Sequence, residues 1–161
     1  MNIRKALETD FESIWEIFSK VIESGDTYVF TPNTPKKDLK KHWFANYMET
    51  FVIEDHEQIL GTYIIKPNQI GLGNHIANCS YMVNPISQGK GIGKKLCEHS
   101  LQIAKERGFE GIQFNIVVST NKRAVDLWKF FGFEIIGITP NGFRHVKLGL
   151  VDTFIMYKCL K

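Results

Sequence analysis

A strand, a glycine-rich turn and the start of a helix follow one another within fifteen residues, from Tyr81 to Lys95. The first amides of a helix have no partner within it, and the helix dipole adds positive charge there, so anions bind at such ends. Three alternating glycines between positions 89 and 93 let the backbone approach a phosphate closely, and nearby lysines add positive charge. The stretch therefore predicts a pyrophosphate-binding turn.

Two common phosphate-binding motifs do not fit this turn. A P-loop would place a glycine at position 88 and a hydroxyl residue at position 95, where the chain has Gln88 and Lys95. The dinucleotide fingerprint would require a glycine at Lys94. A glycine-rich helix start without a ligand remains as the structural alternative.

Composition narrows the class of protein. A length of 161 residues fits one domain, residues 1–161, that can bury a core. A net charge of +3 is too small to predict a nucleic-acid partner. The apolar runs are shorter than the roughly 20 residues that span a bilayer. Three cysteines without a C-x-x-C pair indicate neither disulfides nor a metal site, so we expect a cytoplasmic protein without metal or membrane contact.

The rest of the chain alternates strand and helix patterns, which favours a mixed α/β sheet with helices on both faces. Strands are expected at 2–6, 51–54, 59–66, 75–83, 111–118, 134–138 and 151–160. Helices are expected after a capping box from Thr9 to Glu12, after Thr34, after the glycine turn, and after Ser119 or Thr120. The apolar face of the second helix is expected to consist of Leu39, Trp43, Phe44 and Tyr47. Thr139 to Leu150 is expected to form a long turn-rich excursion.

Polar residues interrupt two of the expected strands. Asn78 and Ser80 share one face of the strand that enters the glycine turn, which suits a strand end that lines a site. Asn115 interrupts a β-branched strand, where asparagine is unfavourable and costly to bury without partners. Asn115 is either a satisfied structural residue or a side chain aimed into a cleft.

The sequence resembles a known family in two places. Gln88, Gly91 and Gly93 match Q/R-x-x-G-x-G/A, which resembles motif A of the GNAT superfamily of acetyl-CoA-dependent N-acyltransferases. About thirty residues later, N-x-x-A-x-x-x-W-x-x-x-G-F from Asn121 to Phe133 resembles motif B. The resemblance implies a single-domain α/β fold, with a mixed, mostly antiparallel twisted sheet of about seven strands and about four helices.

The resemblance also implies where acetyl-CoA binds. The loop amides would hold the pyrophosphate, and the preceding strand would lie beside the pantetheine arm. The implied acetyl-CoA-binding residues are Tyr81, Met82, Val83, Gln88, Gly89, Lys90, Gly91, Ile92, Gly93, Lys94, Asn121 and Trp128. No metal is implied.

A subgroup that includes acetyltransferases of proline analogues is similar around Asn78 and Asn115. This implies a small amino-acid-like amine as acceptor, with Asn115 at its carboxylate and Asn78 nearby. The segment between the first two strands closes over the acceptor in this family, so Tyr28, Phe30 and Trp43 are candidate acceptor contacts.

Trp128 departs from the family pattern, because many members have a tyrosine there that protonates the leaving thiolate. Tyr28, Tyr81 or a water is an alternative proton source. We expect a neutral amine to attack the thioester directly, with a backbone N–H near Met82 or Val83 polarising the carbonyl. No acidic residue is an obvious base, so water held by Asn115, Ser80 or Ser119 is expected to take the proton. The candidate catalytic residues are Asn115, Tyr28 and Ser80.

Other functions stay open at this stage. Cys79 could accept the acyl group in a ping-pong scheme, although its apolar face fits a buried thiol. The domain could bind acyl-CoA without turnover as a sensor, or it could acetylate a protein or peptide amine. The excursion from Thr139 to Leu150 favours a closed pocket, over which His145 could fold. The resemblance also implies a homodimer, paired through the final strands or through the segment from Thr139 to Leu150.

Overall fold

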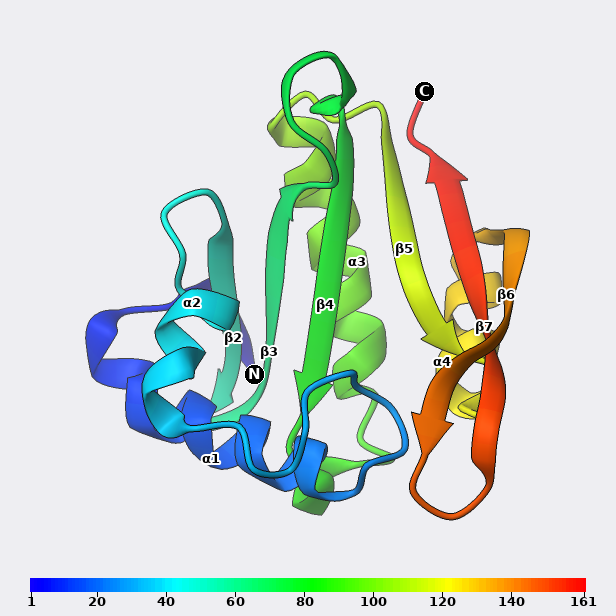
Figure 1. Ribbon diagram of the computed structural model, residues 1–161. Coiled ribbons are helices and arrows are strands. Elements are labelled where there is room, and N and C mark those ends of the chain that lie inside the picture. Colours follow the sequence, from blue (N-terminus) through cyan, green and yellow to red (C-terminus); the bar gives the residue numbers. More distant parts are fainter.

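The computed structural model describes residues 1–161 and contains one seven-stranded sheet (Figure 1). The strand order is β1-β2-β3-β4-β5-β7-β6, and only β4 and β5 run parallel. The expected mixed, mostly antiparallel sheet is therefore confirmed. The strands are β1 (Asn2–Lys5), β2 (Glu49–Asp55), β3 (Gln58–Pro67), β4 (Ile76–Val83), β5 (Gly111–Val118), β6 (Glu134–His145) and β7 (Gly149–Cys159).

Four α-helices cover the two faces of the sheet, as expected. One core lies beneath the first two helices and contains Val52, Ile64 and Met82; the other lies beneath the last two. None of these helices combines the length and the hydropathy needed to cross a membrane. The helices are α1 (Phe11–Glu23), α2 (Leu39–Trp43), α3 (Ile92–Glu106) and α4 (Lys122–Phe130).

Strand β4 contributes side chains to both cores, because its side chains alternate between the two faces of the sheet. Ala77 and Cys79 are buried on the α3 side, whereas Met82 is buried on the α1 side. Successive side chains of a strand point to opposite faces, so the predicted division of this strand is confirmed. Asn78 and Ser80 therefore share the face of Met82.

Strands β4 and β5 form only two residue pairs before they diverge. Ile76 pairs with Gly111 and Ala77 with Ile112, after which the two strands splay apart (Figure 1). On its other edge, β5 shifts register against β7 between Phe114 and Val117, which is a β-bulge. Bulges re-aim side chains and are common next to active sites. The divergence opens a gap in the middle of the sheet.

The segment from Thr139 to Leu150 is not a turn-rich excursion. β6 continues to His145 and β7 begins at Gly149, so this segment forms much of a long hairpin. Its turn-forming residues build a bulge instead, where Asn141 adopts a φ of 53° and its N–H donates to Asp152 Oδ1 at 2.9 Å. The prediction was wrong because glycine and proline also occur in bulges and edge strands, not only in turns.

Two helix boundaries also differ from the predictions. The Asp10 carboxylate, rather than Glu12, accepts a hydrogen bond at the start of the first helix, from the Leu7 N–H at 2.7 Å. Helix α2 ends at Trp43, so Tyr47 lies beyond it and is exposed instead of completing its apolar face.

Trp43 tests the core beneath α1 and α2, because it is fully buried and its indole N–H donates to Thr62 Oγ1 at 3.0 Å. Trp43→Ala removes a large buried ring and leaves Thr62 without that partner, so we expect the free energy of unfolding to fall by about 3–5 kcal/mol. Tyr47→Ala is the matched control and should change it by less than about 1 kcal/mol. Urea denaturation measures both; equal losses would contradict the placement of Trp43.

Candidate active site

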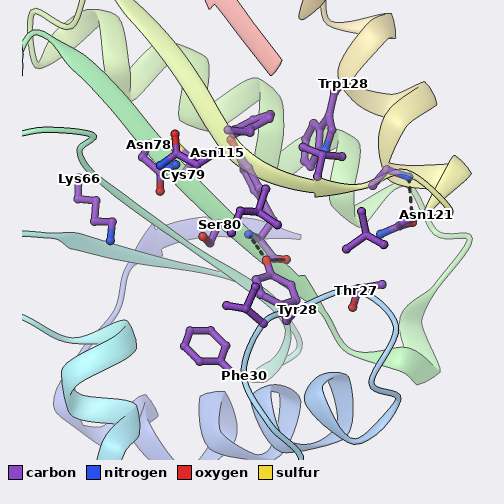
Figure 2. A pocket seen from close by; sticks show the side chains of 17 residues that line it. Thr27, Tyr28, Phe30, Lys66, Asn78, Cys79, Ser80, Asn115, Asn121 and Trp128 are labelled. Atoms are coloured by element: carbon purple, nitrogen blue, oxygen red, sulfur yellow. Dashed lines mark hydrogen bonds between the residues drawn. The ribbon is translucent and has the colours of Figure 1, made fainter. Parts of the chain in front are cut away.

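A cavity of about 340 Å³ lies where β4 and β5 diverge (Figure 2). The loop before α2 covers one side, and α4 lines the other. No Asp, Glu or His lines the cavity, and its size lies in the range of small-molecule sites. The side chains with polar atoms along it are Thr27, Tyr28, Lys66, Asn78, Cys79, Ser80, Tyr81, Asn115, Asn121 and Trp128.

The Tyr28 hydroxyl bridges the exposed backbone edge of β4. It accepts a hydrogen bond from the Tyr81 N–H at 2.8 Å and donates one to the Tyr81 carbonyl. β5 does not pair with β4 at this position, so the N–H and carbonyl of Tyr81 would lack protein partners without the Tyr28 hydroxyl. Burial raises the pKa of the Tyr28 hydroxyl well above its ordinary value, so it stays protonated. Phe30 stacks on Tyr28 and also lines the cavity, whereas Trp43 lies in the core.

The sequence predicts that the backbone N–H of Met82 or Val83, at the end of β4, polarises the thioester carbonyl. The directions of the β4 N–H groups distinguish these two candidates. Backbone groups of a strand alternate between its two edges. The Tyr81 N–H points toward the gap, as its bond to Tyr28 shows, and the Asn84 N–H bonds to Leu60 on the β3 side. The Val83 N–H therefore faces the gap, whereas the Met82 N–H belongs to the ladder with β3.

Side-chain amides cluster at one end of the cavity. Asn115 Nδ2 donates to Asn68 Oδ1 at 2.8 Å, and Asn115 Oδ1 accepts from Gln113 Nε2 at 3.0 Å. Asn78 Nδ2 donates to the Gln113 carbonyl at 2.9 Å, across the start of the gap. Asn115 is exposed and lines the cavity, as expected for a side chain aimed into a cleft. Its amide is also hydrogen bonded to two neighbours, as expected for a satisfied structural residue. Ser80 makes no side-chain hydrogen bond within the protein and borders the same space.

Trp128 closes the cavity on the α4 side. Its ring lies 4.9 Å from Tyr81 and 4.8 Å from Phe114 between centroids, and it is largely buried. The Tyr81 hydroxyl is hydrogen bonded to Ser100 Oγ at 2.7 Å, and burial raises its pKa well above the ordinary value. Tyr81 and Tyr28 are therefore both protonated at neutral pH, and both hydroxyls are hydrogen bonded within the protein.

The glycine-rich turn joins the end of β4 to α3. Gly89 and Gly91 have φ values of 83° and 74°, a region that glycine adopts without steric cost. A Cβ at Gly93 would lie 3.3 Å from Leu127, so this glycine allows close packing on α4. Gln88 accepts a hydrogen bond from Arg123 at 3.1 Å, which ties the turn to α4 as well.

Positive groups surround this turn. The first α3 amides, of Ile92, Gly93 and Lys94, precede the first helical hydrogen bond, from Lys95 to Gly91. Lys90 and Lys94 are exposed, and the Lys94 ammonium lies 4.5 Å from the Phe130 ring centroid. The geometry matches the anion-binding turn that the sequence predicts.

Asn121 rather than Ser119 or Thr120 caps α4. Its Oδ1 accepts a hydrogen bond from the Ala124 N–H at 3.2 Å, so the prediction of a hydroxyl cap was wrong. Asparagine is among the best N-cap residues. The cap leaves its side-chain N–H groups free of protein partners at the edge of the cavity (Figure 2).

His145 does not line the cavity. Its Nδ1 accepts hydrogen bonds from the Lys147 and Leu148 amides, which stabilises the turn between β6 and β7. That turn reaches the end of α1, where the Val146 N–H donates to the Gly25 carbonyl at 3.2 Å.

Lys66 and Thr27 are polar residues that line the cavity, although the sequence analysis gave neither as a site candidate. Lys66 lies at the end of β3, where it pairs with Asn78 of β4. The pairing of strands β3 and β4 would have identified Lys66, because a residue opposite Asn78 can face the same cavity. The sequence alone does not give the register of this pairing.

Comparison with known proteins assigns the family. The sequence profile of the Acetyltransferase (GNAT) family matches residues 11–133. N-acetyltransferase aca1 of Schizosaccharomyces pombe is 35% identical over 151 residues, covering 83% of this chain and 72% of that protein. YwnH of Bacillus subtilis, provisionally named a phosphinothricin acetyltransferase, is 27% identical over 146 residues, covering 87% and 88%.

A solved structure supports the same family assignment. A GCN5-related N-acetyltransferase from Kribbella flavida superposes with a TM-score of 0.93 at 33% identity, covering 98% of this chain and 96% of that chain. The chain therefore belongs to the GNAT family, as its two motifs predicted. It is an acetyl-CoA-dependent N-acetyltransferase.

The cysteines provide a test of the cavity wall. Burial raises the pKa of the Cys79 thiol to about 12, which argues against an acyl-accepting thiolate. Cys97 is also buried, whereas Cys159 is exposed. We expect iodoacetamide to label Cys159 alone in the native protein, as followed by mass spectrometry.

Cys159→Ser should abolish this labelling, and urea should expose the other two thiols. Modification of native Cys79 at the rate of Cys159 would contradict the description of a buried, protonated thiol.

Proposed function

We propose that this enzyme acetylates the amine of a small, amino-acid-like molecule by direct attack on acetyl-CoA within a ternary complex. The observation that supports this most is the cavity between β4 and β5, which is small, covered by the Tyr28 loop and ends at an amide cluster. The name of the relative YwnH, which specifies phosphinothricin, also supports a small-molecule acceptor.

The chain offers a continuous surface for acetyl-CoA. The turn from Gln88 to Lys94 would hold the pyrophosphate through backbone amides and lysines, and the open edge of β4 at Tyr81 and Val83 would face the pantetheine arm. Asn121, with free N–H groups, and the Trp128 ring border the same gap. Acetyl-CoA supplies the activated acetyl group.

Catalysis would depend mainly on placement. Holding an amine against the thioester contributes several kcal/mol, on the order of 7–11 in well-oriented systems. The Val83 N–H, which faces the gap, would stabilise the oxyanion of the tetrahedral intermediate. The amine nitrogen forms the new C–N bond, the C–S bond breaks, and CoA leaves as thiolate.

Proton transfer would use water. The cavity has no carboxylate or imidazole on its wall, so Ser80 and Asn115 are the groups that could hold a water near the amine. Tyr28 would fix β4 through its two backbone bonds, and its raised pKa makes it a poor acid for the thiolate. Because CoA thiol is acidic enough to leave unprotonated, Trp128 in place of tyrosine is compatible with turnover.

We also infer a cytoplasmic homodimer. Three free thiols, two of them buried, suit a reducing compartment. Strand β6 forms an edge of the sheet and exposes Ile135, Ile136 and Ile138, an apolar surface that a second copy could cover.

Thiol release from acetyl-CoA tests the acceptor class. The panel contains amino acids, proline analogues, polyamines and lysine-containing peptides. We expect release with a small amino acid. Release with peptides alone would indicate a protein acetyltransferase, and acetyl-CoA binding without release for any amine would indicate a sensor.

Asn115→Ala tests the acceptor end of the cavity. Loss of a polar contact to the acceptor costs about 1.4 kcal/mol, so we expect about a tenfold higher KM for the acceptor. The affinity for acetyl-CoA should not change, as calorimetry would show. Asn74→Ala, at an exposed loop position, is the control. An unchanged acceptor KM in the Asn115 variant would remove this residue from the site.

Two glycines of α3 form a matched pair for the acetyl-CoA site. Gly91 and Gly108 flank opposite ends of the helix with φ values of 74° and 77°, and a Cβ at either would meet open space. Each change to alanine should therefore cost similar stability, about 1–2 kcal/mol. We expect only Gly91→Ala to weaken acetyl-CoA binding, by at least about tenfold. Equal affinity in both variants would contradict a pyrophosphate site at this turn.

A further inference from the structure

Lys66 is the only charged side chain that lines the cavity. It is half-buried, and it forms no ion pair with any carboxylate of the chain. Its ammonium lies 5.8 Å from the centroid of the Tyr47 ring, a weak contact at the surface. A partly desolvated cation without a counterion gains most from an anionic ligand, because such charge-assisted hydrogen bonds are the strong ones.

Lys66 lies in the same cavity as the part of β4 beside which the amine would be acetylated. Lys66 pairs with Asn78 in the sheet and lies at the end of the cavity away from Asn121 (Figure 2). Asn78 and Tyr81 are three residues apart along β4, about 10 Å. Lys66 and Tyr81 line the same cavity. A group bound by Lys66 would therefore belong to the same small molecule as an amine placed in the cavity beside Ser80 and Tyr81.

The surroundings make the cavity selective for negative charge. No carboxylate lines it, so a second cationic group on the acceptor would meet only the repulsion of Lys66. His42 packs against Phe30 next to the cavity at 4.6 Å between ring centroids. Burial lowers the pKa of His42, so this ring is neutral at pH 7 and Lys66 supplies the charge. The neighbouring amides of Asn78 and Asn115 are uncharged donors that complement an anion.

We propose that Lys66 is the specificity-determining residue of the acceptor site and selects amines that carry a carboxylate on the same small molecule. This deepens the proposed function and depends on it. Diamines, polyamines and lysine side chains would be disfavoured by the same charge. Lys66 acts on binding and orientation of the acceptor, and takes no proton from it.

Matched acceptor pairs test this assignment. Each pair consists of an amino acid and its carboxamide, L-proline with L-prolinamide and L-alanine with L-alaninamide, and putrescine is the dication. Acetylation is measured as CoA release by wild type, Lys66→Met, Lys66→Glu and Lys66→Arg. Lys105→Met, a change on the exposed side of α3, is the control.

We expect the wild type to prefer the acid over the amide, and Lys66→Met to lower kcat/KM for the acid about ten- to hundredfold through KM, with little change for the amide. Lys66→Glu should invert the preference and favour putrescine. Lys66→Arg should retain much of the wild-type preference. All variants should bind acetyl-CoA as the wild type does.

Two outcomes would overturn the assignment while leaving the small-amine function intact: wild-type preference for the amides, or an equal loss for acid and amide in Lys66→Met. The second would mean that Lys66 only supports the structure. Acetyl-CoA binding without turnover of any acceptor, carboxylates included, would overturn the proposed function and this inference together.

Discussion

The structure depends on the early separation of two parallel strands. β4 and β5 pair at only two positions, and the backbone groups beyond them need other partners. Asn78 bridges to the Gln113 carbonyl at the start of the gap, and Tyr28 satisfies both backbone groups of Tyr81 farther along. These contacts hold the gap open without strand pairing, and the cavity occupies the space that they leave.

The two ends of β4 give the gap a direction. At the end of β4, the turn with Gly91 presents helix amides and lysines to an anion. Near the start of β4, Lys66 lies close to the side-chain amides of Asn78 and Asn115. The Val83 N–H faces the space between these polar ends. A site without carboxylates or imidazoles on its wall suits a reaction in which placement of two substrates contributes most of the acceleration.

Local patterns in the sequence predicted much of the fold. Alternation in β4, the β-branched run of β5 and the glycine turn depend on neighbours in sequence, so their elements were predicted correctly. The hairpin of β6 and β7 was missed, because Pro140 and Gly142 indicate turns wherever they occur and only the pairing partner reveals a bulge. The cap at Asn121 was missed because hydroxyl residues precede it and are also good caps.

The candidate site was partly predictable for the same reason. Asn115 and Asn78 were singled out because asparagine is unusual in a strand, and Tyr28 because the family resemblance places its segment over the acceptor. The structure brings all three to one cavity. The bonds that Tyr28 makes with Tyr81 join residues 53 positions apart, and no local pattern contains them. Lys66 looks like an ordinary strand-end lysine until the register sets it opposite Asn78.

Amide hydrogen exchange of β4, measured by NMR with and without saturating acetyl-CoA, tests the central claim that the open edge of this strand holds the thioester. Met82 is the internal reference, because its amide lies in the ladder with β3. We expect acetyl-CoA to slow exchange at Val83 by at least about tenfold, with little change at Met82. Tight binding of acetyl-CoA with unchanged exchange at Val83 would contradict the account.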